Sequence, residues 1–484
     1  MTVAPLAWTG ATASPGSASV NEPFSASEPG SAPGPESAAA PGPASAPVRE
    51  APPGSHWLPP LRLPRALLDP APTGLPAGDG DGLVTMRLAI GAGCISAIEA
   101  VPSGPEWAAA PLAITPPVDA HVHLDKAFSW SAFPNRAATM AAALAANGRE
   151  ADQRTADQVL ERGEAALERA WRYGLRGLRS HVDSAGPAAE ASWQALLELQ
   201  QRWRGRLELQ LVALVPIAHW TSPAGLELAR RVAGAGGLLG GVLGPPFRRS
   251  ASDSDHLLAL LRLAERLGCA VDLHVDEGSA APGAGVALLT GLIERQGCGV
   301  PVTCSHASSM GLLPLEPRIR LADRMAAVGL QVVALPTTNF WLLGHQDGLT
   351  TPERPLAPIR LLQQAGVPVA VGGDNVQDPW YPGGDFDPID LLRFAAPAAQ
   401  LAPWRRLGLT PFTSAAARLM GLPWDGVLRV GSPADLVVLG ANSWSELLAR
   451  TPQRRVLRSG EWLQPPAAEA PQPGLAEFAA SAGP

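Results

Sequence analysis

The middle of the chain alternates short apolar runs with longer segments in which apolar and polar positions recur at helical spacing. Short apolar runs between turn residues are typical of buried strands, and the longer segments are typical of amphipathic helices. Two helical segments have clear boundaries: a capping-box sequence at Thr155 opens a run that ends at Gly174, and a second run ends at Gly268. The eight apolar runs are 112–123, 175–182, 207–216, 238–244, 270–275, 300–305, 330–336 and 367–373.

Strands that alternate with helices predict a parallel sheet. Eight of them over the segment 113–419 fit a (β/α)₈ TIM-type barrel, which is the fold we expect for this α/β chain. An open, doubly wound parallel sheet is the alternative that the pattern alone leaves open.

Both flanks of this segment are also strand-like. The stretches 56–112 and 420–465 contain short apolar runs with glycine-rich turns, and we expect them to form one small β-sandwich domain from both ends of the chain. Residues 1–55 are rich in proline, alanine and serine, and the tail 466–484 is similar. Few large apolar side chains are available there to offset the entropy of ordering, so we predict that both tails are disordered.

Composition narrows the class of partner. The net charge is −7 and no basic run occurs, so we expect neither a nucleic acid nor an anionic membrane surface as a partner. No apolar stretch is long enough to span a membrane, and no basic residue precedes an apolar region at the N-terminus, so we expect no secretory signal. The four cysteines lack a paired spacing, which suits a reducing, cytoplasmic setting. The pattern leaves open whether the chain forms a homo-oligomer.

Histidines and acidic residues close several of the predicted strands. They are His121 and His123 on the first, His181 and Asp183 on the second, His274 and Glu277 on the fifth, His306 on the sixth and Asp374 on the eighth. Active sites of such barrels lie at the carboxyl ends of the strands, so these side chains are expected to converge on one rim. Because the burial of unpaired polar groups is unfavourable, a bound divalent metal ion would explain the convergence.

The His-x-His spacing of His121 and His123 has a direct geometric meaning. Residues two apart on a strand point to the same side, so both imidazoles can bind one ion. We predict a mononuclear site with His121, His123, His274 and Asp374 as ligands and a water molecule in the open position. Two-metal barrel hydrolases usually bridge their ions with a carboxylated lysine on the fourth strand, and the run 238–244 has none. Mixed nitrogen and oxygen ligands suit Zn²⁺ or Fe²⁺, and Mn²⁺ is also compatible.

Lys126 is the single lysine among 37 basic residues, and it stands three positions after His123. A chemical role at the site would explain why this lysine persists in a chain that otherwise uses arginine. Chance survival under biased codon usage would explain it equally well.

The motifs at the strand ends resemble those of the cytosine deaminase branch of the amidohydrolase superfamily, from about residue 116 to residue 462. The most specific feature is an aspartate followed, after three residues, by Asp-Pro-Trp-Tyr-Pro, and the small β domain from both termini matches the superfamily. The matching segments are His-Val-His-Leu-Asp at 121–125, Ser-His-Val-Asp at 180–183, Asp-Leu-His-Val-Asp-Glu at 272–277, Val-Thr-Cys-Ser-His at 302–306 and Asp-Asn-Val-Gln-Asp-Pro-Trp-Tyr-Pro at 374–382.

The resemblance implies roles for these residues. Water activated by the metal attacks the carbon that bears the amino group, and ammonia leaves. Glu277 would carry the proton from that water to a ring nitrogen, and His306 would hold the attacking oxygen by a hydrogen bond. Asp374 would bind the metal and accept a proton during collapse of the intermediate. Trp380 would form a wall of the substrate pocket or simply pack, and His181 and Asp183 would orient the ligands.

Two positions depart from the cytosine deaminase pattern. Ile217 stands where that branch has a glutamine that reads the pyrimidine, and Asn375 replaces an aspartate beside the metal ligand. Lys126, in the sequence His-Leu-Asp-Lys, recurs among relatives that act on triazine-type rings. Because substrate-reading groups differ while the hydrolytic groups are kept, we expect deamination of a cytosine-like amino-substituted N-heterocycle rather than of cytosine itself.

Two other functions remain as alternatives. One is an amidohydrolase that cleaves a ring amide or an alkylamine from a related heterocycle, and the more remote one is a barrel that binds a ligand without catalysis. The unrelated zinc nucleobase deaminases are excluded, since they require a Cys-x-x-Cys pair and none occurs here.

Overall fold

The computed structural model describes residues 50–70, 75–101, 104, 107, 109–245 and 249–464. Apart from Glu50, these residues belong to one structural unit, Ala51–Pro484. The predicted disordered segment 1–55 therefore lies outside the described residues except for 50–55, and the predicted tail 466–484 lies outside them entirely.

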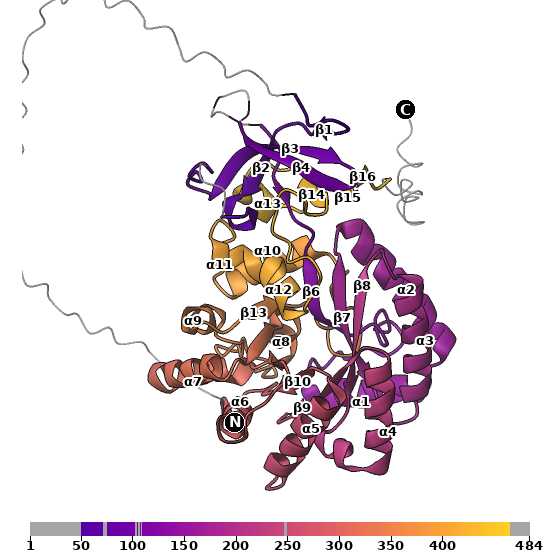
Figure 1. Cartoon of the computed structure of the whole chain (residues 1–484). Coiled ribbons are helices and arrows are strands. Elements are labelled where there is room, and N and C mark those ends of the chain that lie inside the picture. The colour runs from indigo at the N-terminus through magenta and orange to yellow at the C-terminus, as the bar shows by residue number, and fades with distance from the viewer. Residues whose placement is uncertain are drawn as a thin grey trace, which may run out of the picture. The chain divides into compact units, whose positions relative to one another are not determined.

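Eight parallel strands form the central sheet (Figure 1), in the sequential order β6 to β13. The strands are β6 (Val118–Val122), β7 (Gly177–Asp183), β8 (Glu208–Leu214), β9 (Leu238–Leu243), β10 (Val271–Val275), β11 (Val302–His306), β12 (Gln331–Ala334) and β13 (Val369–Val371). Six of the eight predicted apolar runs contain one of these strands each, and β7 and β11 extend one residue beyond the runs 175–182 and 300–305. The last strand returns to the first, because Asp374, just after β13, forms a parallel bridge with Val122 and donates its backbone N–H to the carbonyl of His121 at 2.8 Å. The closed sheet confirms the barrel and excludes the open doubly wound alternative.

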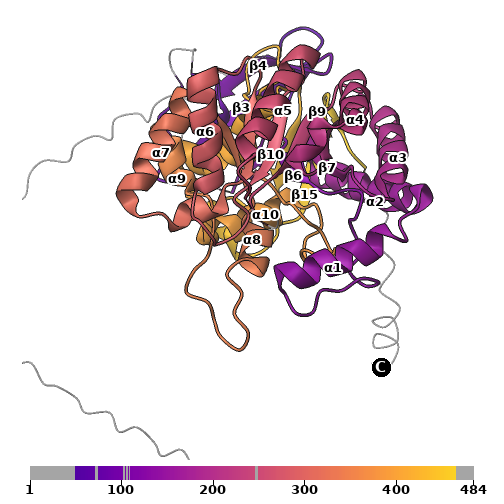
Figure 2. The same ribbon diagram turned by 90° about the horizontal axis from the view of Figure 1, so that it is seen from below.

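Helices lie around the strands, as the view along the barrel in Figure 2 shows for α3 to α7. The predicted boundaries of α2 are confirmed: Thr155 and Gln158 form a complete capping box, and Gly174 ends the helix in the left-handed conformation. The helices are α1 (Met140–Ala151), α2 (Ala156–Tyr173), α3 (Ala189–Arg202), α4 (Pro223–Gly234), α5 (Asp253–Leu267), α6 (Ala284–Gln296), α7 (Leu315–Ala327), α8 (Pro336–Leu342), α9 (Ile359–Ala365), α10 (Pro388–Ala398), α11 (Arg406–Leu409), α12 (Ser414–Leu419) and α13 (Trp444–Ala449).

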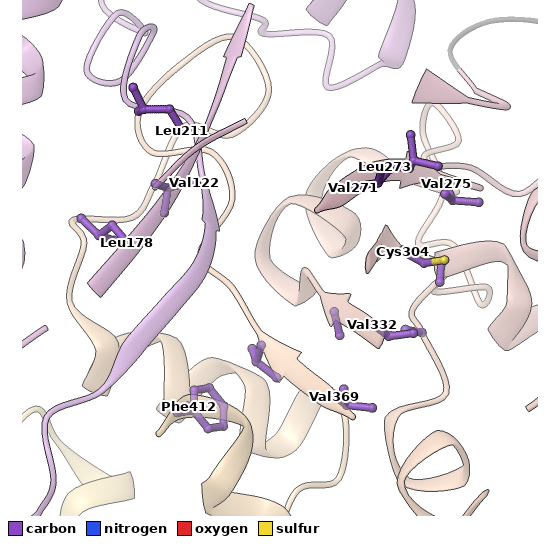
Figure 3. Close-up of a cluster of buried hydrophobic side chains, with 14 of the residues drawn as sticks. Val122, Leu178, Leu211, Val271, Leu273, Val275, Cys304, Val332, Val369 and Phe412 are labelled. Carbon is purple, nitrogen blue, oxygen red and sulfur yellow. The ribbon is translucent and has the colours of Figure 1, made fainter. Parts of the chain in front are cut away.

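Alternation along the strands separates an apolar layer from a polar interior. Val271, Leu273 and Val275 of β10 (Figure 3) belong to the main apolar cluster, which also contains buried side chains of the surrounding helices. The residues between them, Asp272 and His274, contact polar groups of other barrel strands. Because successive strand residues face opposite sides, the apolar set packs the helices on the barrel while the polar set fills the barrel interior.

A second, smaller part of the unit consists of two four-stranded antiparallel sheets, seen above the barrel in Figure 1. Buried residues of both sheets share one apolar cluster. One sheet holds β1 (His56–Trp57), β2 (Leu61–Pro64), β3 (Leu83–Gly91) and β4 (Cys94–Ala100), and the other holds β5 (Ala113–Ile114), β14 (Leu436–Leu439), β15 (Arg454–Arg458) and β16 (Glu461–Trp462). The expected additional β domain from both ends of the chain is thus present.

The predicted run 112–123 is not one strand. Residues Ala113–Ile114 pair with β14 in the small domain, whereas Val118–Val122 pair with β7 in the barrel. Pro116 and Pro117 lie between them. Since proline has no backbone N–H to donate, the pair ends one ladder and lets the chain enter another sheet.

Hydrogen bonds join the small domain to the barrel near the start of β7. Arg458 of β15 donates to the carbonyl oxygen of Leu175 at 2.7 Å, and Arg176 donates to the carbonyl oxygen of Trp424 at 2.5 Å. The guanidinium groups therefore satisfy backbone acceptors on both sides of this junction.

Two observations bear on the setting of the protein. None of the helices within the described residues is long and apolar enough to cross a membrane. Cys94, Cys269, Cys298 and Cys304 are all free thiols. The expected reducing, cytoplasmic setting stays a prediction.

Candidate metal centre and substrate cavity

Four histidines and one aspartate from distant parts of the sequence meet at the carboxyl end of the barrel. His121 lies on β6, His274 on β10 and His306 at the end of β11, while His123 directly follows β6 and Asp374 lies three residues after the end of β13. Oδ1 of Asp374 is 3.4 Å from Nε2 of His121 and 3.3 Å from Nε2 of His123. The ring centroid of His274 is 4.7 Å from that of His121 and 5.0 Å from that of His306.

Two of these residues have strained backbones. His306 has φ of 68° and Asp374 has φ of 60°, in the left-handed region that only a few per cent of non-glycine residues adopt, most often asparagine, aspartate and histidine. Both sit where a strand turns into a loop at the barrel rim. Such strain persists only where the surroundings enforce it, and it is concentrated at functional sites.

Unsatisfied polar atoms mark the centre of the cluster. Several buried atoms there have no hydrogen-bond partner: Nε2 of His121, Nδ1 of His123, Nδ1 of His274, Nε2 of His306 and both carboxylate oxygens of Asp374. Leaving so many buried acceptors and donors unpaired is unfavourable unless another group binds them. Three imidazoles and a carboxylate are a donor set that suits a divalent transition metal, so the residues fit the expected ion.

The ligand atoms are close enough to share one ion. Those of His121, His123 and His274 lie within 4.8 Å of one another, and so do those of His121, His306 and Asp374. All four predicted ligands therefore occur in these two overlapping groups, together with His306, to which the sequence assigned a different role.

The protonation states also suit a metal. Burial lowers the pKa of His123 and lowers that of His274 further, and it lowers the pKa of His306 to about 3, so these imidazoles are neutral near pH 7. Burial alone would raise the pKa of Asp374, but His121 and His123 beside it hold that pKa well below its usual range. Neutral imidazoles and an ionised carboxylate are the forms that bind a cation.

A cavity of about 220 Å³ opens beside the cluster. His123, His274, His306 and Asp374 reach its surface together with Glu277. Oε2 of Glu277 is 3.6 Å from Nε2 of His306, and burial together with the charge of Asp374 raises the pKa of Glu277 well above its usual value. A carboxyl group with a raised pKa beside the metal ligands is suited to taking up and releasing a proton.

The lining of the cavity includes both an apolar wall and polar side chains. Leu214, Val215, Pro216 and Val242 form the apolar wall, in which Pro216 and Val242 are bridge partners. The polar residues of the cavity outside the metal cluster and Glu277 are Lys126, Asn147, Asp183, Asn375 and Trp380. A flat ring that carries polar groups on one edge matches such a cavity, since its apolar portion can contact the apolar wall while its heteroatoms face the polar side chains.

Lys126 and Asp183 form an ion pair among these polar residues, with 2.8 Å between Nζ and Oδ1. Burial lowers the pKa of Lys126, but Asp183 and Asp125 outweigh burial and raise it overall. Lys126 and Arg154 in turn hold the pKa of Asp183 well below its usual range despite burial. The pair is therefore charged, and the ammonium group, which has three hydrogens, retains donors for a ligand in the cavity.

The segment after Asp374 is folded around another aspartate. Asp378 accepts hydrogen bonds from the side chain of Asn375 at 2.7 Å and from the backbone N–H groups of Trp380 and Tyr381 at 2.9 and 3.3 Å. These contacts fix Asn375 and Trp380 at the cavity surface, where the sequence led us to expect them. The Asp-Pro-Trp-Tyr-Pro motif is thus a turn that presents a polar and an aromatic side chain.

Ile217, which was expected where a substrate-reading group stands, does not line the cavity, and neither does His181, which was expected to orient the ligands. Strand β8 ends at Leu214 and the chain turns at Pro216, so the cavity receives Leu214, Val215 and Pro216 while Ile217 begins a 3₁₀ turn behind them. His181 lies two residues before Asp183 on β7, and its ring stacks on that of His121, with 3.7 Å between the ring centroids.

Helix α1 supplies a wall that the sequence analysis did not anticipate. Leu144, Asn147 and Ala151 line the cavity and are spaced by three and four residues, so they share one face of the helix. Asn147 donates to Asp183 at 3.4 Å, while its buried side-chain oxygen has no partner. The helical spacing of these residues could have placed them on one face of a helix. It could not have shown whether that face lines a cavity or packs in the core.

Three comparisons with known proteins agree with this geometry. A sequence model described as the amidohydrolase family matches residues 134–461. Pterin deaminase of Rhizobium rhizogenes is 34% identical over 347 residues, which cover 71% of this chain and 78% of that protein. N-isopropylammelide isopropyl amidohydrolase of Pseudomonas sp. (strain ADP) is 26% identical over 337 residues, which cover 67% of this chain and 79% of that protein. The crystal structure of 5-methylcytosine deaminase from Klebsiella pneumoniae with 5-fluorocytosine matches with a TM-score of 0.72 and 25% identity, over 86% of this chain and 98% of that one.

Proposed function

The chain belongs to the amidohydrolase family, and we propose on that premise that its substrate is an amino-oxo heterocycle of the pterin type. It is a metal-dependent hydrolase that removes an amino group from an N-heterocycle and releases ammonia. The observation that carries the proposal is the position of Glu277, whose carboxyl group shares one cavity with the metal ligands and with polar side chains suited to a ring edge.

His121, His123, His274 and Asp374 would hold the ion in this proposal. The chemistry that a divalent cation would supply there is a lower pKa for a water molecule, which would make that water a nucleophile near neutral pH. Glu277 accepts a proton from the water and donates it to a ring nitrogen of the substrate, and His306 donates a hydrogen bond to the attacking oxygen. Asp374 takes the remaining proton of the water and passes it to the departing nitrogen. One carbon–oxygen bond forms, one carbon–nitrogen bond breaks, and ammonia leaves.

We propose a single ion, either Zn²⁺ or Fe²⁺, with Mn²⁺ also compatible. Strand β9 consists of Leu, Leu, Gly, Gly, Val and Leu, so it offers no lysine or carboxylate that could bridge a second ion. Metal analysis of the purified protein, which we expect to give one divalent ion per chain, tests this part of the proposal.

The walls of the cavity favour a pterin over a single pyrimidine ring. Lys126 and Asn375 can donate hydrogen bonds to a ring carbonyl, and the wall from Leu214 to Val242 gives a second, less polar ring an apolar surface to contact. The relative with 34% identity is a pterin deaminase, which supports the same substrate class.

Ammonia release from a panel of heterocycles tests the substrate class. We expect turnover of pterin to exceed that of cytosine, 5-methylcytosine and guanine. Those rings contact the apolar wall less completely or form fewer hydrogen bonds to the polar residues of the cavity. Faster turnover of cytosine than of pterin would contradict the pterin assignment but not the deaminase assignment.

The variant Glu277→Gln tests the catalytic assignment. It keeps the size of the side chain but cannot shuttle a proton, so we expect a loss of about 10²- to 10⁴-fold in kcat with the metal content unchanged. Full activity of this variant would remove Glu277 from the mechanism, whereas lost activity together with lost metal would make it a ligand.

Cleavage of an alkylamine is the second candidate, because the chain is 26% identical to N-isopropylammelide isopropyl amidohydrolase. Isopropylamine release from N-isopropylammelide, measured beside ammonia release from pterin, separates the two. Absence of turnover on every substrate with metal still bound would favour a non-catalytic barrel.

A further inference from the structure

A chain of three hydrogen bonds lies behind His121, on the side away from the cavity. Nδ1 of His121 is 2.8 Å from Oγ of Ser305, and Oγ of Ser305 donates to Oδ1 of Asp272 at 2.7 Å. Arg179 donates to the other oxygen of Asp272 at 2.8 Å. His121, Ser305 and Asp272 are fully buried and Arg179 is 3% exposed, so water does not compete for these bonds.

The donor and acceptor capacities of these groups fix the direction of each hydrogen bond in the series. The carboxylate of Asp272 can only accept, so the single hydroxyl hydrogen of Ser305 points to Asp272. Toward His121, Oγ of Ser305 is then an acceptor, and Nδ1 of His121 must carry the hydrogen. Nε2 of His121 is left with a free lone pair, and this is the buried nitrogen without a partner that faces Asp374.

The far end of the chain is anchored in the barrel. Arg179 of β7 also donates to Oε1 of Gln210 at 3.1 Å, and Gln210 donates to the carbonyl oxygen of Met420 at 2.7 Å. The participants come from β6, β11, β10, β7 and β8, so the chain ties together strands on different sides of the barrel interior. His181 stacks on His121 at 3.7 Å between ring centroids and restricts rotation of that ring.

The same neighbourhood could be taken for a second metal site, since His121, His181 and Asp272 also form a close group. The ion pair between Arg179 and Asp272, with 2.8 Å between NH1 and Oδ2, argues against it, because a guanidinium group already balances the charge of that carboxylate. Nδ1 of His121, moreover, is already bonded to Ser305.

We infer that Ser305, Asp272 and Arg179 are positioning residues that hold His121 in the tautomer and orientation in which Nε2 binds the metal ion. The inference rests on the metal site of the proposed function and adds residues that support that site from outside the ligand set. Groups that bind the second nitrogen of a ligand histidine fix its tautomer and raise its basicity.

Competition for Zn²⁺ with a chromophoric chelator measures the effect directly and needs no substrate. Ser305→Ala removes the acceptor for Nδ1, and we expect the affinity of the protein for Zn²⁺ to fall about 10- to 100-fold. Asp272→Asn keeps the shape but presents an amide that can donate to Ser305. The hydroxyl hydrogen then turns toward His121 and favours the tautomer with hydrogen on Nε2, so a similar loss is expected.

Thr303→Val is the matched control. Thr303 lies two residues before Ser305 on β11, is 2% exposed and bonds to Gln331 at 3.3 Å, but it has no contact with His121 among the hydrogen bonds of the described residues. We expect this variant to change thermal stability while its Zn²⁺ affinity stays within about twofold of the parent.

The outcomes separate the inference from the proposed function. Wild-type protein that binds none of Zn²⁺, Fe²⁺ and Mn²⁺ would overturn the metal site itself. Wild-type binding with an unchanged affinity in Ser305→Ala or Asp272→Asn would overturn the positioning role alone, as would an equal loss in Thr303→Val. If Ser305→Ala does not fold, Asp272→Asn, which replaces one oxygen by an amino group, carries the test.

Discussion

Lys126 is the single lysine of the chain, and its side chain is 2% exposed with its ammonium group at the cavity surface. Replacing it with methionine keeps the length and the apolar stem but removes the donor. Because a hydrogen bond from a charged donor is worth about 1.5–3 kcal/mol, we expect kcat/KM for pterin to fall roughly 10- to 150-fold, mainly through KM. Steady-state kinetics check this.

The matched control for Lys126→Met is Arg149→Met. Arg149 lies on the exposed face of α1 and donates to the carbonyl oxygen of Ala145 in its own helix at 3.1 Å. The variant Arg149→Met removes one positive charge without changing a residue that lines the cavity, so kcat/KM should stay within about twofold of the parent. Equal losses in both variants would assign the effect to the general field rather than to a contact.

Single residues show where sequence reasoning succeeds and where it stops. The period of two along a strand was sufficient to place His121 and His123 on one side, and strand ends identified the other members of the cluster. Ile217 lies outside the cavity because the chain turns at Pro216, a change of direction that strand periodicity does not encode. Asn147 was missed because its role depends on where α1 packs, which is a tertiary property.

Helix α1 is held to the barrel by a buried group of charges at its carboxyl end. Arg154 bonds to Asp125 at 2.8 Å, to Glu150 at 2.5 Å and to Asp183 at 3.1 Å, and its side chain has no exposed area. Arg162 adds a second bond to Glu150 at 2.7 Å. The wall that carries Asn147 is therefore fixed to the same aspartate that pairs with Lys126.

Arg154→Met should destabilise the fold and loosen this wall. It leaves the carboxylates of Asp125 and Glu150 buried without their main partner, so we expect a loss of about 3–5 kcal/mol in the free energy of unfolding. Urea denaturation measures it. Arg320→Met, which breaks an exposed pair with Glu316 on α7, should change stability by less than about 0.5 kcal/mol. Similar values for the two would show that the buried charges do not stabilise α1.

Whole elements were predicted well where local signals and burial agree. The capping box at Thr155 and the glycine at Gly174 fixed both ends of α2, because each satisfies backbone groups that the helix cannot. The run 112–123 was assigned to one strand because apolar periodicity does not tell which sheet a strand joins. Pro116 and Pro117 supplied the only local sign of a break.

The junction of the barrel and the small β domain depends on a glycine. Gly174 has φ of 96°, and a Cβ atom there would lie 2.4 Å from Cγ2 of Val437 on β14. Gly174→Ala should therefore lower the free energy of unfolding by about 2–4 kcal/mol, from the left-handed backbone and from overpacking together. Chemical denaturation measures this value.

Gly268→Ala separates those two contributions. Gly268 ends α5 with φ of 67°, and a Cβ atom there would have no neighbour within 4 Å. Gly268→Ala therefore adds only the cost of a left-handed backbone at alanine, so we expect the free energy of unfolding to fall by about 1–2 kcal/mol. If both variants lose the same amount, close packing at the junction contributes nothing to stability.

At the scale of the whole molecule, eight strands and their order were evident from alternation, since sequential strands of such barrels are neighbours. The closure of the sheet between β6 and β13 was not evident from alternation, because the bridge between Val122 and Asp374 joins positions far apart in the chain. The pairing of β5 with β14 in the small domain was equally inaccessible, since β-sheet partners are chosen by the packing of the complete core.

The separate origins of the hydrolytic groups and of the wall from α1 have a practical meaning for protein engineers. The ligands and Glu277 stand on the barrel strands and the loops at their ends, whereas Leu144, Asn147 and Ala151 come from helix α1. A mutant library restricted to these three positions of α1 can explore new substrates while every hydrolytic group keeps its setting. The groups that carry out hydrolysis and these three substrate-facing positions therefore lie on different elements and can be altered separately.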